Sequence, residues 1–148
     1  MTKHSLADFA VLTLRRSRFR GSGRTLRIIG EDLQWVALVE KVSHVDQVNI
    51  EVGIVFVPSP PKKRIDCRVL WSLDGFGGDQ ADEVARALVA VTDYTIEERE
   101  AIVGDAIMRM AAFVHDHPDI ASVKQAYRQG QLAKAFLFAD AKELLESP

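Results

Sequence analysis

The segment "VNIEVGIVF", residues 48–56, decides the fold. Every second residue in it is apolar: Val48, Ile50, Val52, Ile54 and Phe56. Polar or small residues occupy most of the positions between them. Because successive side chains of a β-strand point to opposite faces of a sheet, this pattern predicts a strand with one face in the core and the other toward solvent.

Three further runs are expected to form strands, over residues 25–29, 33–42 and 65–73. The last of them alternates like the first segment, with Cys67 in the apolar set and Arg68 in the polar set. The second is almost wholly apolar, which is typical of a central strand. The connections are short and rich in turn residues, so none of them can be a crossover helix. The sequence therefore predicts a four-stranded antiparallel meander.

Helical periodicity flanks the strands on both sides. One helix is expected before them and four after them, over residues 5–17, 79–91, 95–115, 118–130 and 132–145. Thr95 and Glu98 have the spacing of a capping box at the start of the third. We therefore expect a single α+β domain over residues 1–148, with the sheet in about 24–74 and helices in about 79–146. These helices are expected to cover the apolar face of the sheet.

The second face of the expected sheet carries polar side chains. They come from Thr25, Arg27, Asn49, Glu51, Asp66, Arg68 and Ser72. We expect this face to be solvated, mixed in charge and broad enough to receive a large, flat partner.

Positive charge is concentrated in residues 15–27, which we call the arginine elbow. It contains six arginines, at positions 15, 16, 18, 20, 24 and 27, and no acidic residue. The whole chain has a formal charge of −2, and without these six arginines 13 basic residues remain against 21 acidic ones, a balance of −8. The arginines either form a solvated basic face paired with acids such as Glu31, Asp32 and Glu51, or bind carboxylate or phosphate groups of a partner.

The glycines of the elbow, in "GSG" at 21–23, do not form a phosphate-binding loop. Such a loop follows a strand, precedes a helix and ends in a lysine, whereas this one follows a helix and precedes a strand. We expect a turn instead, in which Gly21 provides the left-handed cap of the first helix and Gly23 lets the chain enter the first strand.

Other polar clusters give weak indications of chemistry. In "HDHPD", residues 115–119, the side chains of the two histidines would point about 200° apart on a helix. We therefore expect histidines that are stabilised by the C-terminal end of a helix rather than ligands of a metal ion. Cys67 is expected to be a buried small apolar residue rather than a nucleophile. Ser43, His44 and Asp46 lie too close together on one loop to form a catalytic triad. Trp35 belongs either to the core or to an exposed face, where it would contact a partner.

The single cysteine excludes an internal disulfide and favours a reducing compartment. No apolar run approaches the roughly 20 residues of a membrane helix. We therefore expect a cytoplasmic protein without membrane contact.

Several residues resemble a large family of bacterial proteins that is catalogued only as a domain of unknown function. They are Phe19, Arg20, Gly23, Arg24, Thr25 and Arg27, then Lys41 and Ser43, then Val48, Asn49, Val52, Gly53 and Ile54. The chain departs from the family at Leu26, where phenylalanine is usual, and at Val39 and Glu40. The resemblance covers about the first half of the chain and carries over no catalytic residue. It implies a small cytoplasmic bacterial protein of a kind often found beside secreted toxins, which an immunity protein neutralises by direct binding.

These observations lead to a prediction of a non-enzymatic protein-interaction module without cofactor or metal. Its expected binding residues are Arg18, Arg20, Arg24, Arg27, Glu51 and Arg68. Two alternatives stay open. One is a nucleic-acid or phosphate-ligand binder that uses the elbow, whose affinity would fall steeply with salt. The other is an enzyme with a small-molecule pocket between sheet and helices.

Overall fold

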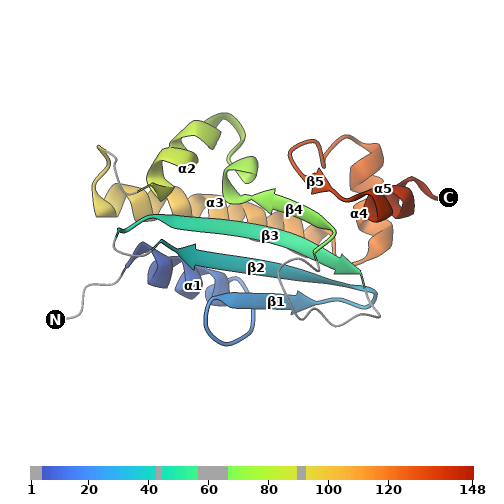
Figure 1. Cartoon of the computed structure of the whole chain (residues 1–148), viewed down its shortest axis with the longest axis horizontal. Coiled ribbons are helices and arrows are strands. Elements are labelled where there is room, and N and C mark those ends of the chain that lie inside the picture. The colour runs from blue at the N-terminus through green and yellow to red at the C-terminus, as the bar shows by residue number, and fades with distance from the viewer. Residues whose placement is uncertain (1–4, 43–44, 57–66, 90–92) are drawn as a thin grey trace.

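A computed structural model describes residues 5–42, 45–56, 67–89 and 93–148 and shows an α+β fold. An N-terminal helix precedes an antiparallel sheet, and further helices follow it (Figure 1). The elements are α1 (Leu6–Arg16), β1 (Thr25–Ile29), β2 (Leu33–Lys41), β3 (Val48–Phe56), β4 (Val69–Ser72), the 3-10 turns η2 (Leu73–Phe76) and η3 (Gly78–Gln80), α2 (Ala81–Leu88), α3 (Ile96–Asp116), α4 (Ile120–Arg128), β5 (Phe136–Leu137) and α5 (Ala139–Glu146).

The sheet has the order β1-β2-β3-β4-β5, and every neighbouring pair is antiparallel. The predicted meander of the first four strands is therefore confirmed. Its fourth strand is shorter than expected and begins at Val69, while residues 65 and 66 lie outside the described part of the chain. The connection expected at residues 58–63 also lies there.

The prediction of four strands is wrong, because a fifth strand pairs with β4. Leu137 lies opposite Val69 and Phe136 opposite Leu70, and the Phe138 amide donates to the Arg68 carbonyl at 3.0 Å. The helix expected over residues 132–145 accordingly begins only at Ala139. Backbone groups at the outer edge of β4 require hydrogen-bond partners. A two-residue strand supplies them and leaves almost no trace in the sequence pattern.

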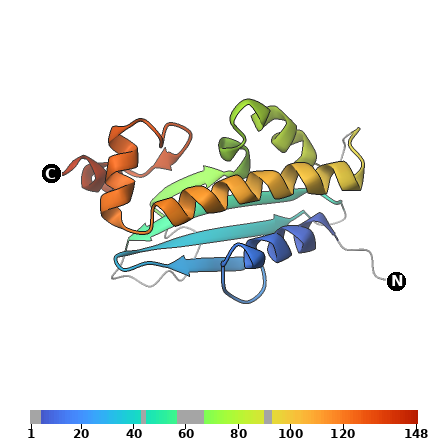
Figure 2. The ribbon, with the colours of Figure 1, turned by 180° about the vertical axis from the view of Figure 1, so that it is seen from behind.

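One face of the sheet is covered by α1 and α3, which lie across it in Figure 2. The main core lies between these layers and includes Leu6 and Leu14 of α1, Trp35 of β2, and Ile107 and Met110 of α3. The capping box predicted at the start of α3 is confirmed: the Thr95 amide donates to Glu98 Oε1 at 2.9 Å and the Glu98 amide to Thr95 Oγ1 at 3.1 Å. The helices α4 and α5 lie beyond the C-terminal end of α3 (Figure 2).

The opposite face of the sheet is not the uniformly solvated surface that we expected. Its centre is a second apolar cluster of buried residues with the half-buried Leu70 against it: Val36, Leu38, Val55 and Cys67. Asn49 and Ser72 are exposed, whereas Thr25, Arg27 and Glu51 are half-buried and Asp66 lies outside the described residues. Polar residues therefore occupy the rim of this face and apolar ones its middle.

Cys67 is buried as predicted but lies on the other face from Val69 and Trp71. It precedes the first residue of β4, so the alternation of the strand does not extend to it. Gly53 of β3 makes room for it, because a Cβ at Gly53 would come within 2.9 Å of Cys67 Sγ. The cysteine therefore fills a gap on the face opposite the helices.

The tryptophans belong to the core. Trp35 is 1% exposed, and its indole Nε1 donates to the His117 carbonyl at 2.8 Å. Its ring lies 5.5 Å from that of Trp71 and 6.1 Å from that of Phe113. The core interpretation of Trp35 is confirmed, and an exposed contact with a partner is excluded for it.

The last helix is tied to α4 by a hydrogen bond at the surface, which gives a pH-dependent prediction. The Tyr127 hydroxyl donates to Glu146 Oε1 at 2.8 Å, and this bond raises the pKa of Tyr127 above its ordinary value of 10.0. Because folding raises this pKa, the bond stabilises the folded protein fully below about pH 10. That stabilisation is lost as the pH rises through the pKa of Tyr127 in the folded protein. In a Tyr94→Phe background, where Tyr127 is the only tyrosine, Glu146→Gln is expected to move the tyrosinate absorbance transition to lower pH. An unchanged transition would show that the bond does not form.

Candidate binding site at the arginine elbow

The elbow begins with a left-handed cap at the end of α1. The Arg18 amide donates to the Arg15 carbonyl and the Phe19 amide to the Leu14 carbonyl, both at 3.1 Å. This pair of bonds is the Schellman motif, and Arg18 has the positive φ of 75° that the motif requires. Phe19, the next residue, is fully buried in the core. The prediction that Gly21 caps the helix is therefore wrong, because Arg18 does so.

The two glycines have another purpose, which agrees with the predicted turn. Arg20 and Arg27 exchange two backbone hydrogen bonds of 2.8 and 2.6 Å, so the chain folds back along the outer edge of β1. A Cβ at Gly21 would lie 2.6 Å from the Thr25 carbonyl oxygen, and Gly23 has a φ of 65°. The resulting loop projects from the edge of the sheet (Figure 1).

Two arginines of the elbow stabilise its turn. Arg15 Nη2 donates to the Gly21 carbonyl at 3.3 Å, and Arg20 Nη1 donates to the carbonyls of Arg15 and Phe19 at 3.2 Å. The guanidiniums thus hold carbonyl groups of the elbow itself. Arg16, Arg18 and Arg24 are exposed, and their side chains make no hydrogen bond or ion pair to another described residue.

Glu31 and Asp32, two of the acids expected to neutralise the elbow, form no ion pair with it within the part of the chain that the structure describes. The ion pairs of arginine found there belong to Arg68, Arg99 and Arg109. Asp32 instead accepts a hydrogen bond of 2.9 Å from the Ile120 amide at the start of α4. The interpretation of the elbow as a self-neutralised face therefore finds no support among these residues.

The residues predicted to bind a partner do not form a single site. Arg18, Arg20, Arg24 and Arg27 lie in the elbow or in β1, whereas Arg68 precedes β4, three strand spacings or about 14 Å across the sheet. Arg68 Nε lies 3.3 Å from Asp140 Oδ2, and its guanidinium lies 5.5 Å from the ring centre of Phe138. Arg68 thus helps to hold β5 and α5 in place. Glu51 lies in β3, between the two groups.

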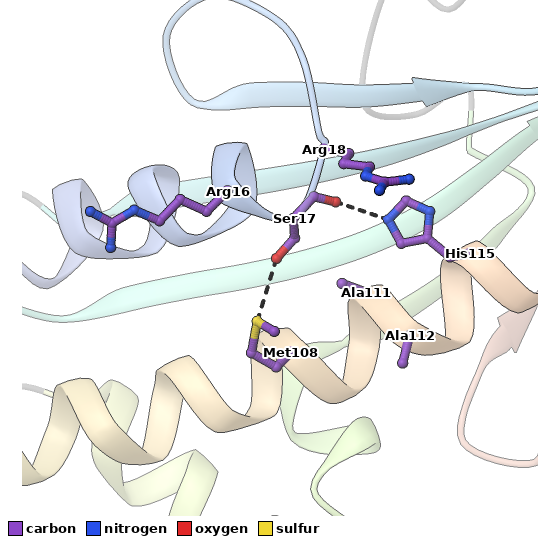
Figure 3. A pocket seen from close by; sticks show the side chains of 7 residues that line it. All are labelled: Arg16, Ser17, Arg18, Met108, Ala111, Ala112 and His115. Atoms are coloured by element: carbon purple, nitrogen blue, oxygen red, sulfur yellow. Dashed lines mark hydrogen bonds between the residues drawn. The ribbon is translucent and has the colours of Figure 1, made fainter.

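A groove that the sequence did not reveal lies between the elbow and α3 (Figure 3). It has a volume of about 270 Å³ and is lined by Arg16, Ser17, Arg18, Met108, Ala111, Ala112 and His115. His115 Nε2 donates to the Ser17 carbonyl at 2.9 Å, and Ser17 Oγ donates to the Thr13 carbonyl at 3.0 Å. These bonds fix the wall of the groove. Met108 contributes an apolar surface, because 57% of it is exposed.

The two histidines of the "HDHPD" segment form hydrogen bonds with different parts of the chain. His117 Nδ1 donates to the Phe113 carbonyl, at 2.6 Å, and its ring lies 4.2 Å from that of Phe113. His115 bonds to the end of α1 instead. In the described ranges, no three His, Cys, Asp or Glu side chains are placed to hold a metal ion together.

A second cavity, of about 410 Å³, lies where η2, the end of α3 and the segment before β5 meet. Trp71, Phe76 and Phe113 form an aromatic triad there, with ring centres 5.7 to 5.9 Å apart. Its lining residues include Asp116 and Lys134 but no serine, threonine or cysteine that would serve as a nucleophile. The cavity therefore combines aromatic rings with the ionisable side chains of Asp116, His117 and Lys134.

None of the helices that the structure describes combines the length and the apolar character needed for a membrane crossing. The resemblance of the first half of the chain to the bacterial family stays a prediction. A comparison of the chain with protein-family models, with curated proteins and with solved structures found no match.

Proposed function

We propose that this protein is a non-enzymatic interaction module that binds an acidic surface of a partner protein through the arginine elbow. The observation that carries the proposal is the state of Arg16, Arg18 and Arg24: they are exposed, and no described carboxylate pairs with them. Guanidinium groups bind carboxylates through paired, charge-assisted hydrogen bonds. The elbow thus presents three such groups: Arg16 from the last turn of α1, Arg18 from the cap of that helix, and Arg24 from the loop before β1.

The elbow is held in its shape before any partner binds. The Schellman motif fixes its start, the Arg20–Arg27 backbone pair fixes its end, and Arg15 and Arg20 hold its carbonyl groups. A binding surface that is already ordered loses less conformational entropy on association. This rigidity favours recognition of a defined surface over loose attraction of any anion.

A protein partner is favoured over a nucleic acid by the charge of the remaining chain. Outside the elbow the formal balance is −8, so an extended polyanion would meet repulsion as soon as it reached beyond the turn. A compact acidic patch on a protein would contact the elbow alone. A toxin neutralised by this chain as its immunity protein, in the cytoplasm, is the partner class that we propose on the strength of the family resemblance.

The proposal is tested by removing charge from the elbow without disturbing its turn. A variant with Arg16→Gln, Arg18→Gln and Arg24→Gln keeps Arg15 and Arg20, which stabilise the loop. Its matched control carries Lys41→Gln, Lys134→Gln and Lys142→Gln, which removes equal charge from exposed sites elsewhere. Tagged wild-type, variant and control proteins are used to capture partners from a lysate of the producing organism, with quantification by mass spectrometry.

We expect a partner that the wild type and the control retain and that the elbow variant loses at least about tenfold, since each lost charge-assisted contact weakens binding substantially. Retention of the same proteins by all three baits would contradict the proposal. Labelled duplex DNA and single-stranded RNA are titrated in parallel at low salt. Binding of either, with loss in the elbow variant alone, would favour the nucleic-acid alternative.

A further inference from the structure

Arg18 occupies a backbone position that normally belongs to glycine. It has a φ of 75°, the only positive φ among the described residues other than glycines. A side chain in this conformation crowds its own backbone, and for this reason glycine is usual at the left-handed position of a Schellman motif. Residues held in such sparsely populated conformations concentrate at functional sites.

The Schellman bonds and the burial of Phe19 hold the backbone of Arg18 in place, but no contact of the Arg18 side chain offsets its strain. Its side chain is exposed and makes no hydrogen bond, ion pair or aromatic contact with another described residue. Its backbone bonds to Arg15 would form equally well with glycine in its place. The guanidinium therefore has no evident role within the folded chain.

The left-handed turn does place the guanidinium at a specific location. Figure 3 shows the Arg18 side chain extending over the end of the groove where His115 lies, whereas Arg16 points away along α1. The floor of the groove consists of Ala111, Ala112 and the exposed Met108. Methionine is flexible and polarisable, so it adapts to an apolar side chain of varied shape. A cation thus stands beside a small apolar depression.

We propose that this groove binds a segment of the partner protein in which an acidic residue stands next to a large apolar one. The carboxylate pairs with Arg18, and the apolar side chain packs on Met108, Ala111 and Ala112. The complementarity of charge and polarity selects this occupant: a purely acidic segment leaves Met108 exposed, and a purely apolar one leaves the guanidinium without a counter-charge. The inference rests on the proposed function, because it names what the elbow recognises.

The first test separates the backbone from the side chain at position 18. Arg18→Gly is expected to raise the melting temperature by about 2–4 °C, because it relieves the left-handed strain. In the same variant we expect binding of an acidic–apolar probe to fall about tenfold. If Arg18 has no role in binding, Arg18→Gly would gain stability without losing affinity for the probe.

The probe is a capped, fluorescein-labelled octapeptide with a central Glu-Leu-Glu sequence. Its binding is measured by fluorescence anisotropy as the protein is titrated up to millimolar concentration. Two matched peptides replace the centre by Gln-Leu-Gln and by Glu-Ala-Glu, and both are expected to bind about tenfold more weakly. Met108→Gln is expected to weaken binding of the leucine peptide but not of the alanine peptide. Lys142→Gln removes an equal charge from an exposed site outside both the groove and the elbow, and it is expected to leave binding within about twofold of wild type.

The inference is overturned if the wild type does not bind the Glu-Leu-Glu peptide, if Arg18→Gly binds it as tightly as the wild type, or if Arg18→Gly gains no stability. Those failures leave the proposed function standing as long as partner capture depends on the elbow. Conversely, capture that is independent of the elbow refutes the proposed function, whatever the melting temperature of Arg18→Gly.

Discussion

Replacement of Arg99 by alanine is expected to lower the free energy of unfolding by about 3 kcal/mol. Arg99 is 5% exposed, and its guanidinium joins segments that are distant in sequence. Nε donates to the Ala87 carbonyl at 2.8 Å, while Nη1 and Nη2 donate to the Asp46 side chain and carbonyl at 2.9 and 2.6 Å. Asp46 in turn accepts a bond of 3.4 Å from the Leu6 amide at the start of α1.

The expected loss at Arg99 comes mainly from the buried carbonyl groups that it leaves without a donor. The Asp46 side chain is 39% exposed, so solvent screens its Coulomb attraction to Arg99. Urea unfolding measures the loss. Arg128→Ala is the matched control, because the hydrogen bond of 3.5 Å from Arg128 Nη2 to the Ser147 carbonyl lies at the surface, and this variant is expected to cost less than about 1 kcal/mol. Equal losses for the two variants would show that the Arg99 network does not stabilise the fold.

Replacement of Trp35 by alanine is expected to cost about 4 kcal/mol, a large part of the roughly 5–15 kcal/mol that stabilises a domain of this size. The indole fills the space between the sheet and the end of α3, against Trp71 and Phe113. It also holds the His117 carbonyl, which follows the last turn of that helix. Alanine would leave both a cavity and a carbonyl group without its donor.

The two parts of the Trp35 effect are separable. Trp35→Phe keeps most of the apolar volume but removes the indole N–H, and we expect it to cost about 2 kcal/mol. Both variants are measured by chemical denaturation, followed by circular dichroism, with the slope of the transition checked against wild type. A cost below about 1 kcal/mol for Trp35→Ala would contradict the placement of this side chain at the centre of the core.

Much of the architecture was predictable because it depends on local periodicity. The segment from Val48 to Phe56, predicted as a strand from its alternation, has the same bounds as β3, and the spacing of Thr95 and Glu98 matches the observed capping box. Both features depend only on residues that are close together in the sequence. The strand formed by Phe136 and Leu137 is different, because it exists only through its pairing with β4. Such a short pairing cannot be read from local pattern.

The candidate site was predictable in its composition but not in its geometry. The six arginines of the elbow are evident from the sequence. The left-handed cap was predicted at Gly21, because glycine is the usual residue there, whereas the structure has it at Arg18. The burial of Phe19 fixes the cap one residue before it, and this burial is a tertiary effect. The groove depends on Met108, which lies far along the chain. The one sequence signal for it is that Met108 falls outside the stripe formed by Ile107, Met110 and the other buried residues of α3.

Hydrogen–deuterium exchange of the protein with and without its captured partner tests the central claim most directly. The account predicts that the partner slows exchange in residues 15–27 and in the stretch of α3 that lines the groove, residues 108–115, and that this protection is absent in the variant with Arg16→Gln, Arg18→Gln and Arg24→Gln. Protection confined to other surfaces, such as the β5 edge with its exposed Phe136, and unchanged exchange in the elbow would contradict it.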